Sequence, residues 1–331
     1  MRAPICFDVH LPVSRVVTIV SNRLYRLHSL NWFDRLSDNL KGISFLMLAS
    51  FVFSIMALLI KLLGQNLHIT QILLVRQVGM IIMVAPAILR DFPGSLRSER
   101  PGLQLVRLLC ALVAMLCGFT AVIHLPLADA TAIFFAKSFF VTILAVFFLS
   151  EAVGVYRWSA VLVGFIGVLI MLQPGTENFS IYGLASLAGA AGAAGVMITL
   201  RLLSRSDSTD TILIYGSVGV GLVMILPGLY YWQQPSLTEW LLLASVGVVS
   251  YFGQKLNIFA YKHGEASLLA SLDYVRLLWA TLFGYLIFDQ FPGGSVWLGA
   301  SIVIGAAIFM IYRETQRKRV YTAVVKRGEM D

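Results

Sequence analysis

Charged residues are scarce in this 331-residue chain, at 13 %, whereas 58 % of its residues are hydrophobic. Soluble domains are roughly 45–50 % apolar and about 25 % charged. A soluble fold of this length has too little interior to bury so much apolar surface. The mean hydropathy of +0.83 indicates that lipid is the solvent for most of the chain.

Cysteine is also rare, with only Cys6, Cys110 and Cys117. An odd number, two of them inside one apolar run, is not a disulfide framework, and we interpret those two as packed core thiols. The five His and three Cys show no metal-ligand spacing. A Walker lysine motif and a convergent set of catalytic groups are absent as well. We therefore expect no metal, no cofactor, no direct use of ATP and no enzymatic activity.

The net charge of +8 is concentrated at the two ends of the chain. Residues 1–41 carry six Lys or Arg against three Asp, and residues 313–331 carry six Lys or Arg against three acids. Basic segments beside a membrane usually face the cytoplasm. We attribute the charge to membrane topology and expect no nucleic-acid partner.

Apolar runs of about the length that crosses a bilayer, roughly 20 residues, recur along the chain. They predict helices near 43–61, 70–89, 103–123, 128–149, 157–173, 181–201, 211–230, 239–260, 266–288 and 295–312. With ten spans, 20 of the 25 Lys and Arg lie on the side of both termini, and only Lys61 lies on the opposite side. By the positive-inside rule we predict a multi-pass protein of the cell (inner) membrane with both termini in the cytoplasm.

The second half of the chain repeats the first with a shift of about 139 residues. The shift superposes Ala121 on Ala260, His124 on His263, Thr142 on Thr281, Gly154 on Gly293, Trp158 on Trp297 and Met171 on Met310. Five spans in each half give the halves opposite orientations, so the predicted fold is all-α, with ten transmembrane helices as two inverted five-helix repeats. Inverted repeats are typical of secondary transporters, although a duplication can also simply enlarge a bundle.

The predicted organisation has four parts. Residues 1–41 form an N-terminal cytoplasmic tail, which is either a helix on the inner leaflet or a loosely ordered segment. The two five-helix repeats cover 42–175 and 180–313, and a cytoplasmic tail covers 314–331.

Several motifs resemble the EamA-type family of the drug/metabolite transporter superfamily. The run TAVIHLPLADATAI, from Thr120 to Ile133, is similar to the family's junction between the third and fourth helices. Further matches are Arg76 in the second helix, Glu151, Trp158, Gly164 and Gly167 around the fifth, and Ala266–Ala270 with Trp279-Ala280 in the ninth. The resemblance covers residues about 42–312.

This resemblance implies a ten-helix bundle with a central cavity lined mainly by the third, fourth, eighth and ninth helices. Family members move amino acids and their metabolites, nucleotide-sugar-like or vitamin-like compounds, and S-adenosylmethionine. Two departures stand out. Ala136-Lys137-Ser138 lies where the family often has Pro, and Asp289-Gln290 lies where Glu151 would recur.

Two cations lie deep in the predicted spans. Lys137 and Arg276 are each about ten residues, roughly 15 Å, into the fourth and ninth spans, and the repeat superposes them. A lone cation at that depth costs about 2.5–3.5 kcal/mol. We predict that both lie near the pseudo-two-fold axis and bind an anionic group of the substrate. Asp273, on the same helix face, allows an alternative in which it neutralises Arg276 within one helix.

Three more residues complete the predicted site. Arg76 could snorkel to the outer face or line the cavity. Tyr274 and Trp279 share the ninth span with Arg276 and could stack on a planar substrate ring, or could simply form core.

The leading hypothesis is a secondary transporter that moves a small polar, anionic or zwitterionic metabolite of amino-acid, nucleoside or vitamin type by alternating access. The alternative is a passive or structural membrane protein without active transport. The expected partners are a small-molecule substrate and the lipid bilayer. The fifth and tenth helices could also pair two chains into a homodimer.

Overall fold

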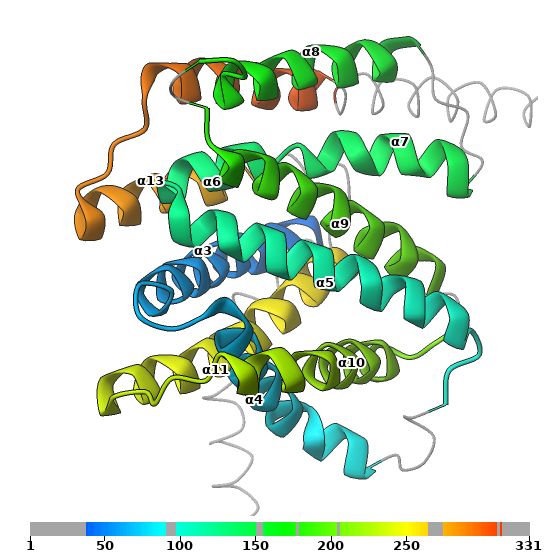
Figure 1. Ribbon diagram of the computed structural model, residues 1–331. Coiled ribbons are helices and arrows are strands. Elements are labelled where there is room, and N and C mark those ends of the chain that lie inside the picture. Colours follow the sequence, from blue (N-terminus) through cyan, green and yellow to red (C-terminus); the bar gives the residue numbers. More distant parts are fainter. Residues whose placement is uncertain are drawn as a thin grey trace, which may run out of the picture.

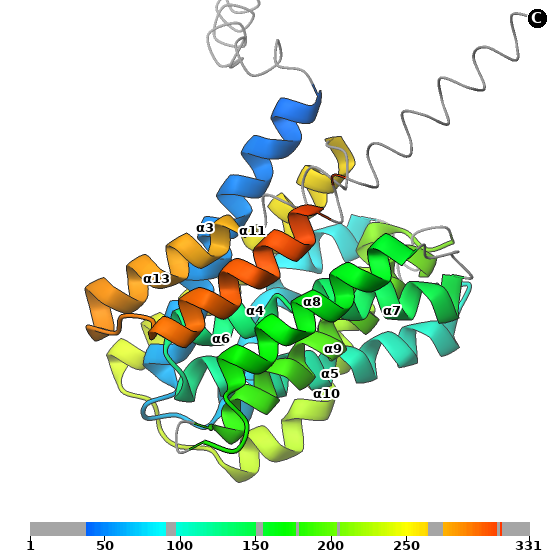
Figure 2. The ribbon, with the colours of Figure 1, turned by 90° about the horizontal axis from the view of Figure 1, so that it is seen from above.

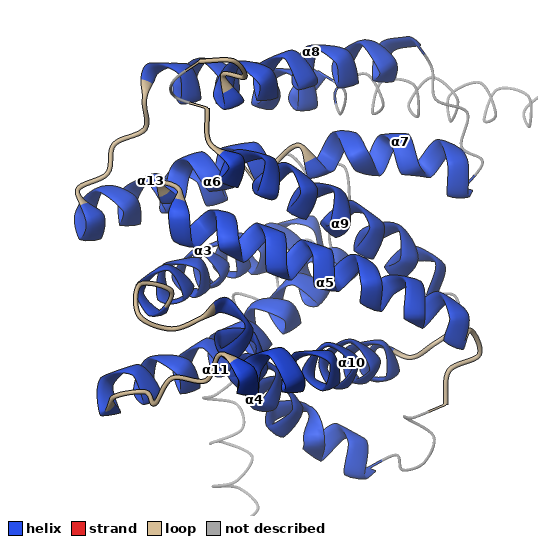
Figure 3. Ribbon diagram, viewed as in Figure 1, coloured by secondary structure: helices blue, strands red, loops and turns tan. Residues whose placement is uncertain are grey.

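The structure, a computed structural model, describes residues 38–90, 97–149, 155–176, 179–203, 206–263, 274–309 and residue 312. Within these ranges all regular structure is helical (Figure 3). In lipid each backbone N–H and C=O must be bonded internally, and a helix achieves this within one segment. The predicted all-α class is confirmed.

The first half of the chain forms α3 (Asp38–Leu63), α4 (Ile69–Arg90), α5 (Pro101–His124), α6 (Leu127–Phe134), α7 (Lys137–Leu149) and α8 (Val155–Leu172). The second half forms α9 (Ile181–Leu203), α10 (Thr209–Tyr230), α11 (Leu237–His263), α13 (Val275–Phe288) and a last helix over Gly294–Phe309.

Every predicted span contains helical residues, but the spans differ in length. Seven stretches in the described ranges are long and apolar enough to cross a membrane, with α6 and α7 counted as one. The other apolar helices are shorter, at Trp158–Leu172, Val275–Phe288 and Gly294–Phe309. Residues 266–273 of the ninth predicted span, 1–37 of the first tail and the whole tail over 314–331 lie outside the described residues. Residues 38–41 of the predicted tail belong to α3.

Helices from the two halves of the chain pack in pairs (Figure 1). α3 lies along α11, α5 lies along α9, and α4 lies along α10. Glycine permits the close approach of α5 and α9, because a Cβ atom on Gly189 would lie 2.7 Å from the backbone nitrogen of Gly118. α8 and the last helix run side by side at one edge of the molecule (Figure 2), where a Cβ on Gly167 would lie 2.8 Å from the Gly299 carbonyl oxygen.

Polar contacts join the two halves at the face to which the sequence assigns Lys61. The Gln71 amide donates to the Gln233 carbonyl at 2.8 Å and accepts from the Gln233 N–H at 3.0 Å. The Asn66 amide donates to Glu239 at 2.9 Å. These bonds hold the α3–α4 turn against the segment between α10 and α11.

A second polar contact joins the halves at the opposite face. Asp207, between α9 and α10, accepts hydrogen bonds from the Ser98 hydroxyl (2.5 Å), the Glu99 N–H (3.0 Å) and the Gln104 amide (2.8 Å). Burial by itself would raise the pKa of Asp207, but these hydrogen bonds outweigh it and hold the pKa below its ordinary value. Asp207 therefore fixes the start of α5 against the second half.

Candidate substrate site

The fourth predicted span is interrupted in its middle. α6 ends at Phe134 and α7 begins at Lys137, with Phe135 and Ala136 forming a turn. The Ala136 N–H bonds to the carbonyl of Ile133, three residues earlier, at 3.0 Å, which is the tighter pattern of a 3-10 helix. The sequence predicts one continuous helix here, and the interruption forms without the Pro that the family often has.

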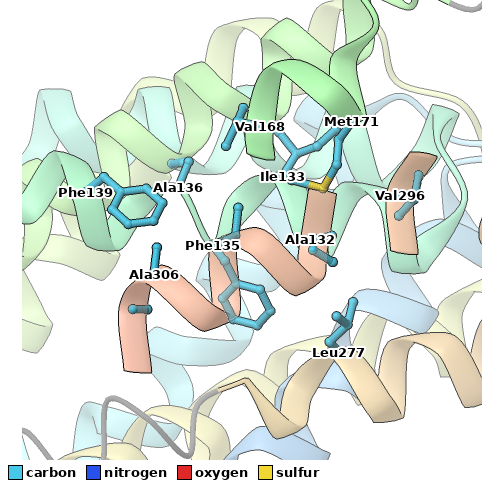
Figure 4. Close-up of a cluster of buried hydrophobic side chains, with 14 of the residues drawn as sticks. Ala132, Ile133, Phe135, Ala136, Phe139, Val168, Met171, Leu277, Val296 and Ala306 are labelled. Carbon is cyan, nitrogen blue, oxygen red and sulfur yellow. The ribbon is translucent and has the colours of Figure 1, made fainter. Parts of the chain in front are cut away.

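α13 begins in the same local conformation at the position that the repeat makes equivalent. Tyr274 directly precedes α13 with φ −63° and ψ −17°, and Phe135 has φ −65° and ψ −14°. The two ring centroids are 4.7 Å apart, and both residues belong to the largest hydrophobic cluster of the described residues. Figure 4 shows part of this cluster, with Phe135 labelled. Of the two interpretations of Tyr274, the structure places its ring in the core, and its contact with substrate stays a prediction.

Lys137 and Arg276 lie in the first turns of α7 and α13. Lys137 Nζ is 5.8 Å from the ring centroid of Phe134, and Arg276 Cζ is 4.9 Å from that of Phe53 on α3. A helix N-terminus carries about half a positive charge, so a cation in the first turn is disfavoured by the helix dipole. That cost adds to the cost of a cation in the bilayer. Each of the two helix starts therefore combines the positive end of a helix dipole with a cationic side chain.

Trp279 lies three residues after Arg276, so it shares a face of α13 with that residue, and it also contacts α3. Its ring centroid is 5.0 Å from that of Phe51, with the rings nearly perpendicular. The indole Nε1 is buried and has no hydrogen-bond partner among the described residues. A buried donor without an acceptor costs about 1–3 kcal/mol. α13 thus places a guanidinium and an indole donor against the aromatic side chains Phe51 and Phe53.

Arg76 does not snorkel to the outer face. Its side chain is 2 % exposed, its Nε donates to the Ser250 hydroxyl at 2.9 Å, and its Nη1 donates to the Gln77 amide oxygen at 2.6 Å. Gln77 in turn donates to the Ser217 carbonyl at 3.3 Å. Arg76 therefore belongs to a buried polar network that joins α4 of the first half to α10 and α11 of the second.

Sequence reasoning missed the interior role of Lys61. Its side chain is 4 % exposed and donates to the carbonyls of Val122 and Leu125 at the end of α5. Asp129, in the first turn of α6, interacts with it electrostatically. The signal was present in the sequence, since Lys61 is the single cation assigned to its face and Asp129 lies at the start of the fourth predicted span, which begins at that face.

Other features of the described residues add no site. Asp273 lies outside those residues, so its pairing with Arg276 stays a prediction. A shallow crevice with a cavity volume of about 10 Å³ has no charged residue in its lining, which comprises Ala128, Leu277, Thr281, Pro292, Val296, Trp297 and Ala300. Ligand pockets typically measure about 300–1,000 Å³. Within the described ranges, no group of three His, Cys, Asp or Glu could hold a metal ion.

Known proteins resemble the chain over most of its length. It is 30 % identical over 281 residues to an S-adenosylmethionine uptake transporter of Rickettsia prowazekii, which is 85 % of this chain and 96 % of the relative. It is 30 % identical to a riboflavin transporter of Vibrio cholerae, over 76 % of this chain and 85 % of the relative. A pseudopaline exporter of Pseudomonas aeruginosa is 28 % identical, over 81 % of this chain and 94 % of the relative. These relatives are named as transporters, not as enzymes.

A solved crystal structure shares the fold. It is 19 % identical, covers 83 % of this chain and 97 % of its own, and superposes with a TM-score of 0.60. The EamA-like transporter family matches the chain twice, over residues 40–173 and 180–312. The chain is a multi-pass membrane protein and belongs to the EamA-like transporter family, within the drug/metabolite transporter superfamily.

Proposed function

We propose that this protein is a secondary transporter of the bacterial inner membrane that moves a small polar metabolite with an anionic or zwitterionic group by alternating access. The observation that carries the proposal is the pair of equivalent helix starts, where the rings of Phe135 and Tyr274 meet and a cation follows two residues later in each half. Interrupted helices that place positive ends near a substrate are a feature of secondary transporters.

The packing supports two inverted five-helix repeats. The shift of about 139 residues carries α3 onto α9 and α5 onto α11, so it exchanges the pair α3–α11 with the pair α9–α5, and both pairs are in contact. Two similar halves that contact each other in this exchanged manner can swap conformations, which would open the site to either face in turn.

The relatives suggest the chemistry of the substrate. S-adenosylmethionine carries a carboxylate and an adenine ring, and riboflavin carries a large planar ring. We propose that Lys137 and Arg276 bind the anionic group while Trp279 and Phe51 contact the planar ring, since aromatic contacts and cation–π contacts suit such a ring. Arg76 would contribute positive charge to the site from its buried hydrogen-bond network. Asp273 would balance the charge of Arg276 before the substrate binds.

Ligand-dependent stability and flux test the proposal. The purified chain is screened by thermal shift against S-adenosylmethionine, riboflavin, amino acids, nucleosides and carboxylate metabolites. A true ligand at about 100 times its Kd should raise the unfolding free energy by about 2.7 kcal/mol. In proteoliposomes the same compound should then show flux that follows its gradient. A passive or structural protein would give neither response.

Site variants separate binding from folding. Lys137→Ala and Arg276→Ala should each abolish flux and the thermal shift while the protein still inserts and folds. Lys255→Ala is the matched control, because its side chain is exposed and its Nζ lies 3.5 Å from the Tyr251 hydroxyl on the same helix. Retained flux in both site variants, with the control also active, would exclude the proposed anion site.

A further inference from the structure

One ammonium group joins the ends of several helices at the face that the charge distribution assigns to the outside. Lys61 lies in the last turn of α3, and its Nζ donates to the Val122 carbonyl at 3.3 Å and to the Leu125 carbonyl. The same Nζ is 5.2 Å from the ring centroid of Phe288, the last residue of α13. The ends of α3 and α5, from the first half, thus meet the end of α13, from the second half, at a single side chain.

The surroundings of this ammonium are those of a cation site. The last carbonyls of α5 have no partner within the helix and form the negative end of its dipole. Asp129 adds a carboxylate that interacts electrostatically with Lys61. The Asp129 Oδ1 atom is buried without a hydrogen-bond partner among the described residues. This atom therefore contributes charge to the site and no hydrogen bond. Carbonyls at the C-terminal ends of helices hold coupling cations in other secondary transporters.

The opposite end of the molecule carries a cation in a different setting. Arg201 lies in the last turn of α9 as Lys61 lies in the last turn of α3, but the Arg201 side chain is exposed, whereas that of Lys61 is 4 % exposed. The burial of the cation is therefore a property of one face. A contact made at one face only would favour the conformation in which that face is closed.

We propose that Lys61 is a tethered cation that locks the outer side of the transporter, occupying a site formed by the α5 carbonyls, Asp129 and the Phe288 ring. The inference rests on the proposed alternating access. To open outward, the end of α13 must move away from α3 and α6, and the ammonium must then lose its contact with the Phe288 ring. The site would accept a small monovalent cation of the alkylammonium type if the Lys61 side chain were absent.

Accessibility in intact cells tests the lock without any knowledge of the substrate. In the full chain with Cys6, Cys110 and Cys117 replaced by Ser, a single probe cysteine is placed by Ala132→Cys, at a position on α6 that is 1 % exposed. A membrane-impermeant maleimide is then added outside the cells. Lys61→Met should raise the labelling rate at least about tenfold, which corresponds to about 1.4 kcal/mol. Lys255→Met, the same change on α11, should leave it unchanged.

Chemical rescue distinguishes a cation site from a packing defect. In Lys61→Ala, propylammonium should return labelling to the level of the parent, whereas propanol at the same concentration should not. Asp129→Asn, which keeps Lys61 and its hydrogen bonds, should raise labelling by a smaller factor. This variant provides the test if the Lys61 variants do not reach the membrane.

Three outcomes would overturn the lock. They are unchanged labelling in folded Lys61→Met and Asp129→Asn, rescue by propanol as well as by propylammonium, and labelling that increases only in inverted vesicles. Because these readouts need no substrate, absence of flux in the proteoliposome assay would count against the proposed function and not against the lock.

Discussion

The rings of Phe135 and Tyr274 meet with centroids 4.7 Å apart, although they are separated along the chain by 139 residues, the same shift that superposes the two halves of the sequence. Gln77 likewise donates to the carbonyl of Gly216, 139 residues later, at 3.4 Å. In the proposed arrangement of two inverted repeats, residues that contact their own repeat equivalents lie at the axis that relates the halves. The starts of α7 and α13 are therefore packed against each other through these two rings. A movement of one helix start must displace the other.

The interruption before α7 predicts a position where proline is tolerated. Ser138 lies in the first turn of α7, where a proline ring is accommodated and only the hydrogen bond from the Ser138 N–H to the Phe135 carbonyl, at 3.1 Å, is lost. We expect Ser138→Pro to change the unfolding free energy by no more than about 1 kcal/mol. Thr142→Pro, four residues further into α7, should cost about 3 kcal/mol or more and serves as the comparison. Equal losses in thermal unfolding of the two variants would mean that α6 and α7 are one continuous helix.

The Arg76 network should show energetic coupling between α4 and α11. Ser250→Ala leaves the buried Arg76 Nε without its acceptor and should destabilise the protein by about 1–3 kcal/mol. Arg76→Met should abolish most of that effect, because no donor then needs the hydroxyl. Ser245→Ala is the control, since Ser245 is exposed on the same helix and bonds only to the Leu241 carbonyl. Additive losses in the double variant, measured by unfolding in detergent, would show that the two residues act separately.

Asp207 predicts a pH-dependent stability of the loop contact. A carboxyl group whose pKa is lower in the folded protein stabilises it fully above the ordinary value of about 3.9 and loses that effect as the pH falls through the folded pKa. At neutral pH, Asp207→Asn should lower the unfolding free energy by about 1–2 kcal/mol. The difference from the parent should shrink below about pH 4.

The control for this prediction is Asp210→Asn, an exposed acid in the first turn of α10. It should cost no more than the contribution of a surface helix dipole, about 0.5 kcal/mol. A parent-to-variant difference for Asp207 that stays constant from neutral to acid pH would show that its hydrogen bonds do not depend on ionisation.

Much of this architecture follows from apolar length and charge placement, because the bilayer imposes helices of a fixed minimum length on any spanning chain. The glycines of α9 are typical of close helix packing, but only the structure shows that Gly189 meets Gly118 of α5. The interruption at Phe135 does not follow from composition, because neither Gly nor Pro marks it and only the backbone hydrogen bonds to residues three earlier reveal it. Arg76 and Lys61 show a second limit. Sequence gives the depth of a cation but not the neighbouring helix that offers it acceptors, and that neighbour decides whether it snorkels or stays buried.

The charge distribution predicts that both tails are cytoplasmic, since 20 of 25 Lys and Arg lie on one side of the ten spans. Reporter fusions before Met1 and after Asp331 should both report a cytoplasmic location. A fusion at the α3–α4 turn, near Asn66, should report the outside. An outside location for either tail would reverse or break the predicted topology and would also move the Lys61 contact to the cytoplasmic face.

The last prediction separates the two interpretations of Arg276. If its guanidinium binds a carboxylate of the substrate, Arg276→Lys should be nearly as damaging to flux as Arg276→Ala, because the planar fork that makes two parallel hydrogen bonds is lost while the charge remains. Both variants should fold at least as well as the parent. Arg276→Ala removes a cation that is costly in the bilayer, and Arg276→Lys keeps the same charge. If Arg276 instead neutralises Asp273, Arg276→Ala should unfold more readily, and adding Asp273→Asn should restore stability. Thermal unfolding and flux of the single and double variants decide between the two. Recovery of both stability and flux in the double variant would exclude Arg276 as a substrate contact and leave Lys137 as the cation that meets the anionic group.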